Sequence, residues 1–107
     1  MHARFERSGR VWTALTDFAD EKRMDQRLVT ALHDVAMSGR VRRTRYEQSE
    51  GLSVQQAQRD LRDLVRGRIL EPVGRTRARF YRAGPEFPET ALEIAHTPVT
   101  LLDPYQR

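Results

Sequence analysis

The chain has 107 residues, a length that fits a single domain with a modest core and no large catalytic cleft. It contains no cysteine, so neither disulfides nor thiolate metal sites can form. No apolar run approaches the roughly 20 residues of a membrane-spanning helix, and the N-terminus lacks the apolar core of a signal peptide. We therefore expect a cytoplasmic protein that makes no contact with a membrane.

Positive charge is concentrated in the middle of the sequence. Residues 38–82 hold twelve arginines and five acidic residues, a surplus of +7, whereas the whole chain has a net charge of +4. Residues 1–37 are balanced, with six basic and six acidic residues, and residues 83–107 hold one arginine and four acidic residues. Such a concentration is typical of proteins that bind a polyanion. The middle segment is therefore the predicted place of a nucleic-acid site.

Two amphipathic helices are predicted before the basic segment. The first runs from about residue 8 to residue 22, where apolar residues recur at helical spacing: Val11, Trp12, Leu15, Phe18 and Ala19. Its aromatic side chains are expected to be buried, either against the following helices or against a second copy of the chain. The second helix begins with Asp25 as its N-cap, ends at residues 38–39 and is expected to be the most buried. It includes His33, which has no second residue at metal-ligand spacing, so we expect no metal site there.

A short strand and a short helix follow. Residues 40–43 are expected to be extended and to add a strand to a small sheet. Thr44 is expected to cap a helix of one to two turns, with Glu47 completing a capping box. This helix ends near Ser49, before a glycine-containing turn at residues 50–52.

The clearest helical pattern lies at Ser53–Gly67. Its apolar residues fall on one stripe: Val54, Ala57, Leu61, Leu64 and Val65. Ser53 and Gln56 are expected to form a capping box, and Gly67 to close the helix in the left-handed conformation.

The opposite face of this helix is basic and amide-rich. It comprises Gln55, Gln56, Arg59, Arg62 and Arg66. Arginine recognises guanine and glutamine recognises adenine through paired hydrogen bonds, so these side chains suit a DNA-reading helix. The same face would also suit ordinary solvated surface, and Asp60 and Asp63 interrupt its positive charge.

A hairpin is predicted at residues 68–82. Two runs of β-branched and aromatic residues flank a glycine-containing loop, and Pro72 belongs on a sheet edge because it lacks an N–H group. The loop places Arg75, Arg77 and Arg79 at its tip, within reach of a phosphate backbone or of the minor groove beside the DNA-reading helix.

Residues 83–107 form an acidic tail with four prolines. A short helix is expected at Glu89–Ala95, and the remainder is expected to be irregular. The apolar residues 98–102 would fold back on the core, pair with a partner or lack order.

Taken together, these elements predict a mainly α-helical fold with a small β-hairpin wing. We expect an N-terminal helix at residues 1–23, a winged helix-turn-helix domain at residues 24–82 and a tail at residues 83–107. Two short helices joined by a tight turn, the second of them basic and capped, are typical of the helix-turn-helix.

Four segments resemble a known family: Arg42-Arg43-Thr44-Arg45-Tyr46, Ala57-Gln58-Arg59-Asp60-Leu61-Arg62-Asp63-Leu64-Val65, Ile69-Leu70-Glu71-Pro72 and Phe80-Tyr81. They are similar to the winged-helix domain that follows the catalytic domain in many bacterial Fic-family proteins. The Fic catalytic motif is His-Pro-Phe followed by a Gly-Asn-Gly-Arg turn, and this sequence contains neither part. The resemblance therefore implies a stand-alone or truncated relative without nucleotidyl-transfer activity.

The expected function is sequence-specific binding of double-stranded DNA by a small transcriptional regulator. No cofactor, metal or enzymatic activity is expected, since no catalytic constellation is present in the sequence. A homodimer through the Trp12 helix is a possible arrangement. The residues expected to contact DNA are Thr44, Arg45, Ser53, Gln55, Gln56, Arg59, Arg62, Arg75, Arg77 and Arg79.

A second function class stays open at this stage. The winged helix would then be a protein-interaction module, because a fold by itself does not determine function. Asp60 and Asp63 favour this alternative, since carboxylates on the basic face would repel phosphates.

Overall fold

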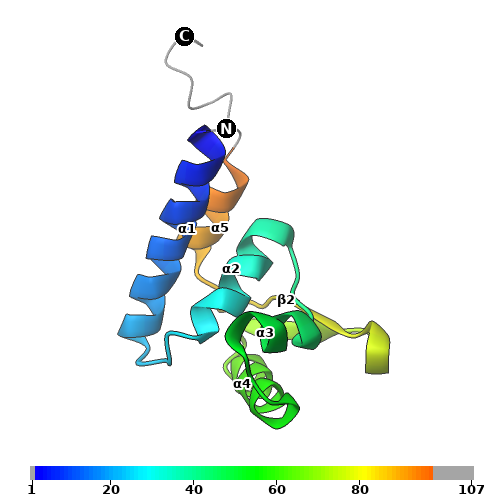
Figure 1. Cartoon of the computed structure of the whole chain (residues 1–107). Coiled ribbons are helices and arrows are strands. Elements are labelled where there is room, and N and C mark those ends of the chain that lie inside the picture. Colours follow the sequence, from blue (N-terminus) through cyan, green and yellow to red (C-terminus); the bar gives the residue numbers. More distant parts are fainter. Residues whose placement is uncertain (1, 98–107) are drawn as a thin grey trace, which may run out of the picture.

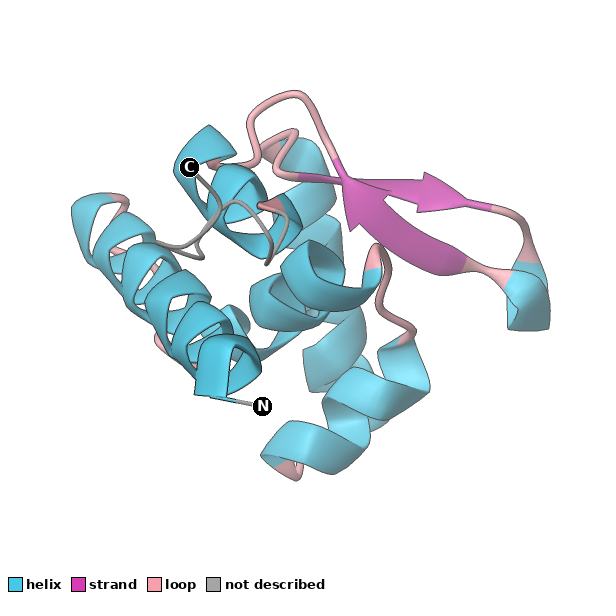
Figure 2. Cartoon of the chain, turned by 90° about the horizontal axis from the view of Figure 1, so that it is seen from above, coloured by secondary structure: helices cyan, strands magenta, loops and turns pink. Residues whose placement is uncertain are grey.

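Helices make up most of the structure, and a β-hairpin projects from one side (Figures 1 and 2). This computed structural model describes the backbone of residues 2–97 and the side chains of residues 6–97. The predicted class, mainly α-helical with a small hairpin, is confirmed. The elements are α1 (His2–Glu21), α2 (Leu28–Ser38), α3 (Arg43–Glu50), α4 (Val54–Arg66), β1 (Leu70–Val73), a 3-10 turn (Thr76–Ala78), β2 (Phe80–Ala83) and α5 (Glu89–His96).

The first and last helices lie side by side and pack against α2 (Figure 1). Val11, Leu15 and Ala19 of α1 are fully buried, and Ala91 and Ala95 of α5 lie in the same core. The predicted first helix is confirmed and begins earlier, at His2, and the predicted helix at 89–95 is confirmed as α5. The helix α5 is therefore part of the core. Residues 98–107, which include the apolar 98–102 segment, lie outside the described residues.

The helix α2 is central, with six residues buried: Leu28, Val29, Ala31, Leu32, Val35 and Ala36. It begins at Leu28, so the prediction that Asp25 caps it was wrong. Residues 26–27 form a turn instead, in which the carboxylate of Asp25 accepts the backbone N–H of Arg27 at 2.9 Å. This turn leaves the side chain of Arg27 directed toward α4, where it has a structural role described below.

The helix α3 begins one residue before the predicted cap. Arg42 occupies the N-cap position without a side-chain capping bond, so the prediction that Thr44 caps this helix was wrong. Glu47 forms an ion pair with Arg43 at 2.6 Å. Gly51 ends the helix with a φ of +62°, a left-handed conformation that glycine adopts without steric cost. The chain thereby turns sharply into α4.

The helix α4 is capped by Ser53 as predicted, but the side chain of Gln56 donates to Asp60 at 2.8 Å and does not complete the predicted capping box, and the helix closes differently at its end. The Ser53 hydroxyl accepts the backbone N–H of Gln56 at 3.1 Å. Gly67 has a right-handed φ of −78°, so the predicted left-handed glycine was wrong. Arg68 takes the positive φ of 64°, and the N–H of Ile69 donates to the carbonyl of Leu64 at 3.0 Å.

The hairpin pairs β1 with β2 in antiparallel register, from Leu70 opposite Ala83 to Val73 opposite Phe80. On the other side of β2, Val41 exchanges two backbone hydrogen bonds with Tyr81, at 2.9 and 2.8 Å. The predicted strand at 40–43 is thus reduced to one bridged residue. Pro72 lies in the outer strand of this small sheet, where its missing N–H costs no ladder hydrogen bond.

Gly84 lets the chain return closely past the end of α4. Its N–H donates to the carbonyl of Ile69 at 2.8 Å. A Cβ atom at this position would lie 2.4 Å from the carbonyl oxygen of Arg68, so a larger residue does not fit without a backbone shift. This close crossing directs the chain from the hairpin back toward α5. Over residues 2–97, no helix is long and apolar enough to cross a membrane.

Candidate nucleic-acid interface

The outward face of α4 presents a row of polar side chains to solvent. Gln55, Arg59, Arg62 and Arg66 are all exposed, while Ala57, Leu61 and Leu64 on the opposite side are buried. Val54, which was assigned to the apolar stripe, is 43% exposed because it lies in the first turn, at the margin of that stripe. The predicted division of α4 into a buried and an exposed face is otherwise confirmed.

A buried carboxylate holds α4 in place. Asp60 is only 5% exposed and accepts four hydrogen bonds. Two come from the guanidinium of Arg27, each at 2.8 Å. The others come from the Tyr46 hydroxyl at 2.7 Å and from the side-chain amide of Gln56 at 2.8 Å. Asp60 thereby joins α4 to α3 and to the segment that precedes α2.

This arrangement keeps Asp60 ionised. Burial by itself raises the pKa of Asp60, but the hydrogen bonds from Arg27, Tyr46 and Gln56 outweigh it and hold the pKa below its usual value. Burial and the hydrogen bond to Asp60 together raise the pKa of Tyr46 well above the usual range. Asp60 therefore remains a carboxylate, and the guanidinium of Arg27 balances its negative charge inside the protein.

Two sequence-based interpretations change as a result. Asp60 does not interrupt the exposed basic face, because it lies in the core beside Arg27. Gln56 is only partly exposed, and its side-chain amide donates to Asp60, so it is less available for a base contact than the sequence indicated. Asp63 does remain exposed and lies 3.7 Å from Arg66.

The hairpin loop presents three arginines beside α4. Arg75, Arg77 and Arg79 are exposed, as predicted. The loop is shaped by a 3-10 turn at 76–78 and by Gly74, whose carbonyl accepts the Nε–H of Arg79 at 3.3 Å. The carbonyl of Arg77 accepts Nη1–H of Arg42 at 3.5 Å, which connects the loop to the start of α3.

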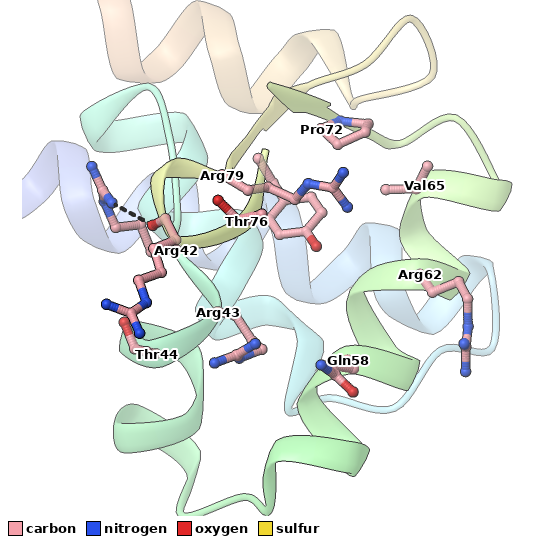
Figure 3. Close-up of a pocket in the computed structure, with 11 residues that line it drawn as sticks. Arg42, Arg43, Thr44, Gln58, Arg62, Val65, Pro72, Thr76 and Arg79 are labelled. Atoms are coloured by element: carbon pink, nitrogen blue, oxygen red, sulfur yellow. Dashed lines mark hydrogen bonds between the residues drawn. The ribbon is translucent and has the colours of Figure 1, made fainter. Parts of the chain in front are cut away.

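Between α3, α4 and the hairpin lies a groove with a volume of about 780 Å³, which we call the basic groove (Figure 3). In Figure 3 the hairpin residues Pro72, Thr76 and Arg79 lie along one side, and Arg43, Thr44 and Gln58 along the other. The lining includes five arginines and no carboxylate. Its residues are Arg42, Arg43, Thr44, Gln58, Arg62, Val65, Pro72, Thr76, Arg77, Arg79 and Tyr81.

The start of α3 adds further donors to the groove. The first N–H groups of a helix have no intrahelical acceptor, and no side chain caps those of α3. Arg42, Arg43 and Thr44, which line the groove, are the N-cap and the first two residues of this helix. Helix N-termini favour phosphate through these N–H groups and the helix dipole. The groove therefore combines guanidinium groups and a hydroxyl, and residues of the α3 N-terminus are part of its lining.

The structure brings four of the ten predicted contact residues together in the basic groove: Thr44, Arg62, Arg77 and Arg79. Gln55 and Arg59 lie outside it, on the exposed face of α4, and Arg75 lies in the hairpin loop. Ser53 is exposed, but its hydroxyl oxygen is used as the helix cap. Arg45 is directed elsewhere and pairs with Asp34 at 3.2 Å.

The sequence-based prediction missed several polar residues of the groove, among them Arg42, Arg43 and Gln58. Arg42 and Arg43 were assigned to an extended segment, and Gln58 was not placed on the exposed face. Gln58 and Arg62 are four residues apart and share a side of α4, so the spacing contained this signal. The position of Arg42 depends on the Val41–Tyr81 bridge, which no local pattern reveals.

Metal-binding side chains do not cluster in the part of the chain that the structure describes. No group of three or more His, Cys, Asp or Glu residues there is placed to hold an ion. His33 is hydrogen-bonded through Nε2 to the Ser8 hydroxyl at 3.1 Å, and its ring contacts Trp12. The contacts with Ser8 and Trp12 account for the position of His33.

The chain was compared with protein-family models, curated proteins and solved structures. None of these three comparisons gave a match, so they neither support nor oppose the expected likeness to Fic-associated winged helices.

Proposed function

We propose that the chain binds double-stranded DNA sequence-specifically and acts as a small transcriptional regulator, with α3, α4 and the hairpin as a winged helix-turn-helix. The observation that supports this most is the basic groove, in which five arginines and no carboxylate lie between a protruding helix and a hairpin. A surface of this kind matches a polyanion in charge. The order of α3, a tight turn, α4 and the hairpin supports the same proposal.

In this proposal α4 enters the major groove, whose width of about 12 Å admits one helix. Gln55 and Arg59 are exposed on the outward face and take the base edges, where amide and guanidinium groups distinguish adenine from guanine. Gln58 lies nearer the hairpin and is a further candidate for a base or sugar contact.

The basic groove then holds the phosphates of one strand. Arg62 comes from α4, Arg42 and Arg43 from the start of α3, and Arg77 and Arg79 from the hairpin. Contacts of this kind fix the register of a protein on the duplex and supply most of its salt-dependent affinity.

The protein-interaction alternative loses part of its basis. It drew on two carboxylates of α4, but Asp60 is buried and paired with Arg27. Asp63 is the one of the two that reaches solvent, and Arg66 lies beside it. The exposed charge of α4 is therefore more positive than the sequence alone indicated, which favours the DNA proposal.

Salt dependence of binding tests the proposal. If each of the five groove arginines neutralises one phosphate, a plot of log affinity against log salt has a slope of about −4.5 with random duplex DNA. The measurement is a fluorescence-anisotropy titration of the full chain at several salt concentrations. Absence of binding at low salt, or a slope near zero, would contradict the proposal. Selection from a pool of random duplexes then identifies the preferred sequence.

A further inference from the structure

Arg7, in the second turn of α1, has two buried nitrogen atoms without a hydrogen-bond partner. Its Nε and Nη2 atoms are closed to solvent, and neither donates to an acceptor within the described residues. No other buried side-chain nitrogen or oxygen atom of residues 6–97 lacks a partner in this way. Burying a charged group is costly unless it is paired, so an acceptor for these two donors is expected.

The place of Arg7 in the fold limits where this acceptor can lie. Arg7 comes four residues before the fully buried Val11, so both lie on the inward face of α1. The helix α1 packs against α5, and in Figure 1 the end of α5 lies beside the start of α1. Ile94, near the end of α5, lines one surface hollow together with Gly9 and Arg10, which agrees with this arrangement. The chain therefore leaves α5 close to Arg7.

The acidic residues of the chain leave one candidate for a carboxylate partner. Of the 15 Asp and Glu residues, all but Asp103 lie among residues 6–97, and none of those forms an ion pair with Arg7. Asp103 follows Thr97, the last described residue, by six positions. An extended chain spans at most about 3.6 Å per residue, so Asp103 can reach about 20 Å from Thr97.

We propose that residues 98–103 turn back over the adjoining ends of α1 and α5, and that the carboxylate of Asp103 accepts the Nε–H and Nη2–H groups of Arg7. These two groups form one side of the guanidinium fork, which matches the two oxygens of a carboxylate. The same chain uses this pairing elsewhere: Arg27 donates from Nε and Nη2 to the two carboxylate oxygens of Asp60, each at 2.8 Å. The unpartnered atoms of Arg7 are the same two.

The residues before Asp103 also suit this position. Val99, Leu101 and Leu102 are apolar, so the hydrophobic effect favours their contact with the helices over exposure to water. The sequence left three alternatives open for residues 98–102, and the unmet donors of Arg7 favour the one in which they fold back on the core. Figure 1 shows the adjoining ends of α1 and α5 away from the hairpin, so this contact does not depend on the proposed function.

A double-mutant cycle in the full chain, without DNA, tests the pair by urea unfolding. Asp103→Asn keeps the shape of the side chain and removes its charge, and Arg7→Met removes the donors. We expect Asp103→Asn to lower the folding equilibrium constant about tenfold, because a hydrogen-bonded charge pair is lost. In the Arg7→Met background the same substitution should change this constant by less than about twofold, because Asp103 then has no partner to lose.

Hydrogen exchange of the Arg7 Nε–H, measured by NMR, reports on the contact directly. Asp103→Asn should make this exchange about tenfold faster, because the segment that covers the group then opens more often. Glu93→Gln is the matched control: Glu93 is an exposed acid of α5, and its removal should leave the exchange and the stability unchanged.

Three results would overturn the proposal. The first is an equal effect of Asp103→Asn in both backgrounds, including no effect in either. The second is an Arg7 Nε–H that exchanges at the same rate in Asp103→Asn as in the unmodified chain, a measurement that needs no variant of Arg7. The third is a loss in Glu93→Gln as large as that in Asp103→Asn, because any negative charge near α5 would then have the same effect.

Discussion

Replacing Asp60 with alanine is expected to lower the free energy of unfolding by about 3–5 kcal/mol. The substitution removes the acceptor of four hydrogen bonds in a site that is almost closed to solvent. The Tyr46 hydroxyl is left buried without its acceptor. Arg27 loses its bidentate ion pair with Asp60 and keeps only the ion pair with Asp25 at 2.7 Å. A domain of this size has a total stability of about 5–15 kcal/mol, so the variant would be close to unfolding.

Urea unfolding followed by circular dichroism measures this loss. Asp63→Ala is the matched control, because Asp63 lies on the same helix but is exposed, and its removal should change stability by no more than about 0.5 kcal/mol. Asp60→Asn keeps the shape of the side chain and an acceptor for Tyr46, so we expect an intermediate loss. If Asp60→Ala were as stable as Asp63→Ala, the buried cluster would have no role in holding α4.

The pH dependence of stability gives a second readout of the same cluster. The pKa of Asp60 is lower in the folded protein than in the unfolded chain, so the unfolded chain binds the proton first as the pH falls. The stabilisation from Asp60 is complete above the ordinary aspartate pKa, about 4, and is lost as the pH falls through the folded value. Below about pH 4 the stability of the unmodified chain should therefore decrease more steeply than that of Asp60→Asn.

Much of the fold was predictable because its signals are local. The apolar spacing in α1, α2 and α4 identified these helices, and Ser53 was correctly identified as a helix cap. The hairpin followed from β-branched and aromatic runs around a glycine. The errors at Asp25, Thr44 and Gly67 concern helix ends, which fray and are placed only to within one or two residues.

The site was less predictable because it depends on contacts between distant residues. The sequence-based interpretation placed Asp60 on the basic face of α4, and only its contacts in the fold, such as the pairing with Arg27 33 positions earlier, show that it is buried. The hydrogen bond from Gln56 to Asp60 likewise makes Gln56 less available for a base contact than the sequence indicated. Arg42 and Arg43 line the groove because Val41 bridges to Tyr81, a contact between residues 40 positions apart. The distribution of charge along the sequence therefore identified the basic region. It could not predict which side chains of that region come together in the groove.

Removing Arg62 and Arg77 together is expected to weaken DNA binding by about a hundredfold at low salt, roughly tenfold for each lost charge-assisted contact. The two residues reach the basic groove from opposite sides, one from α4 and one from the hairpin. If each neutralises one phosphate, the double variant should also show a salt slope that is less steep by about 1.8. Anisotropy titrations with the selected duplex and with a random duplex measure both quantities, and the loss should be similar for the two.

Arg59→Ala should behave differently, which separates base contacts from phosphate contacts. Arg59 is exposed on the outward face of α4, outside the basic groove. Its removal should cost about 1–3 kcal/mol with the selected duplex and much less with random DNA, so specificity decreases. Lys22→Ala is the control for net charge. Lys22 directly follows α1 and does not line the basic groove, so its removal should change neither the affinity nor the specificity.

If the Arg62/Arg77 double variant kept the affinity and the salt slope of the unmodified chain, DNA would have to bind elsewhere. If Lys22→Ala weakened binding as much as the groove variants, only net charge would matter, and the groove would have no special role.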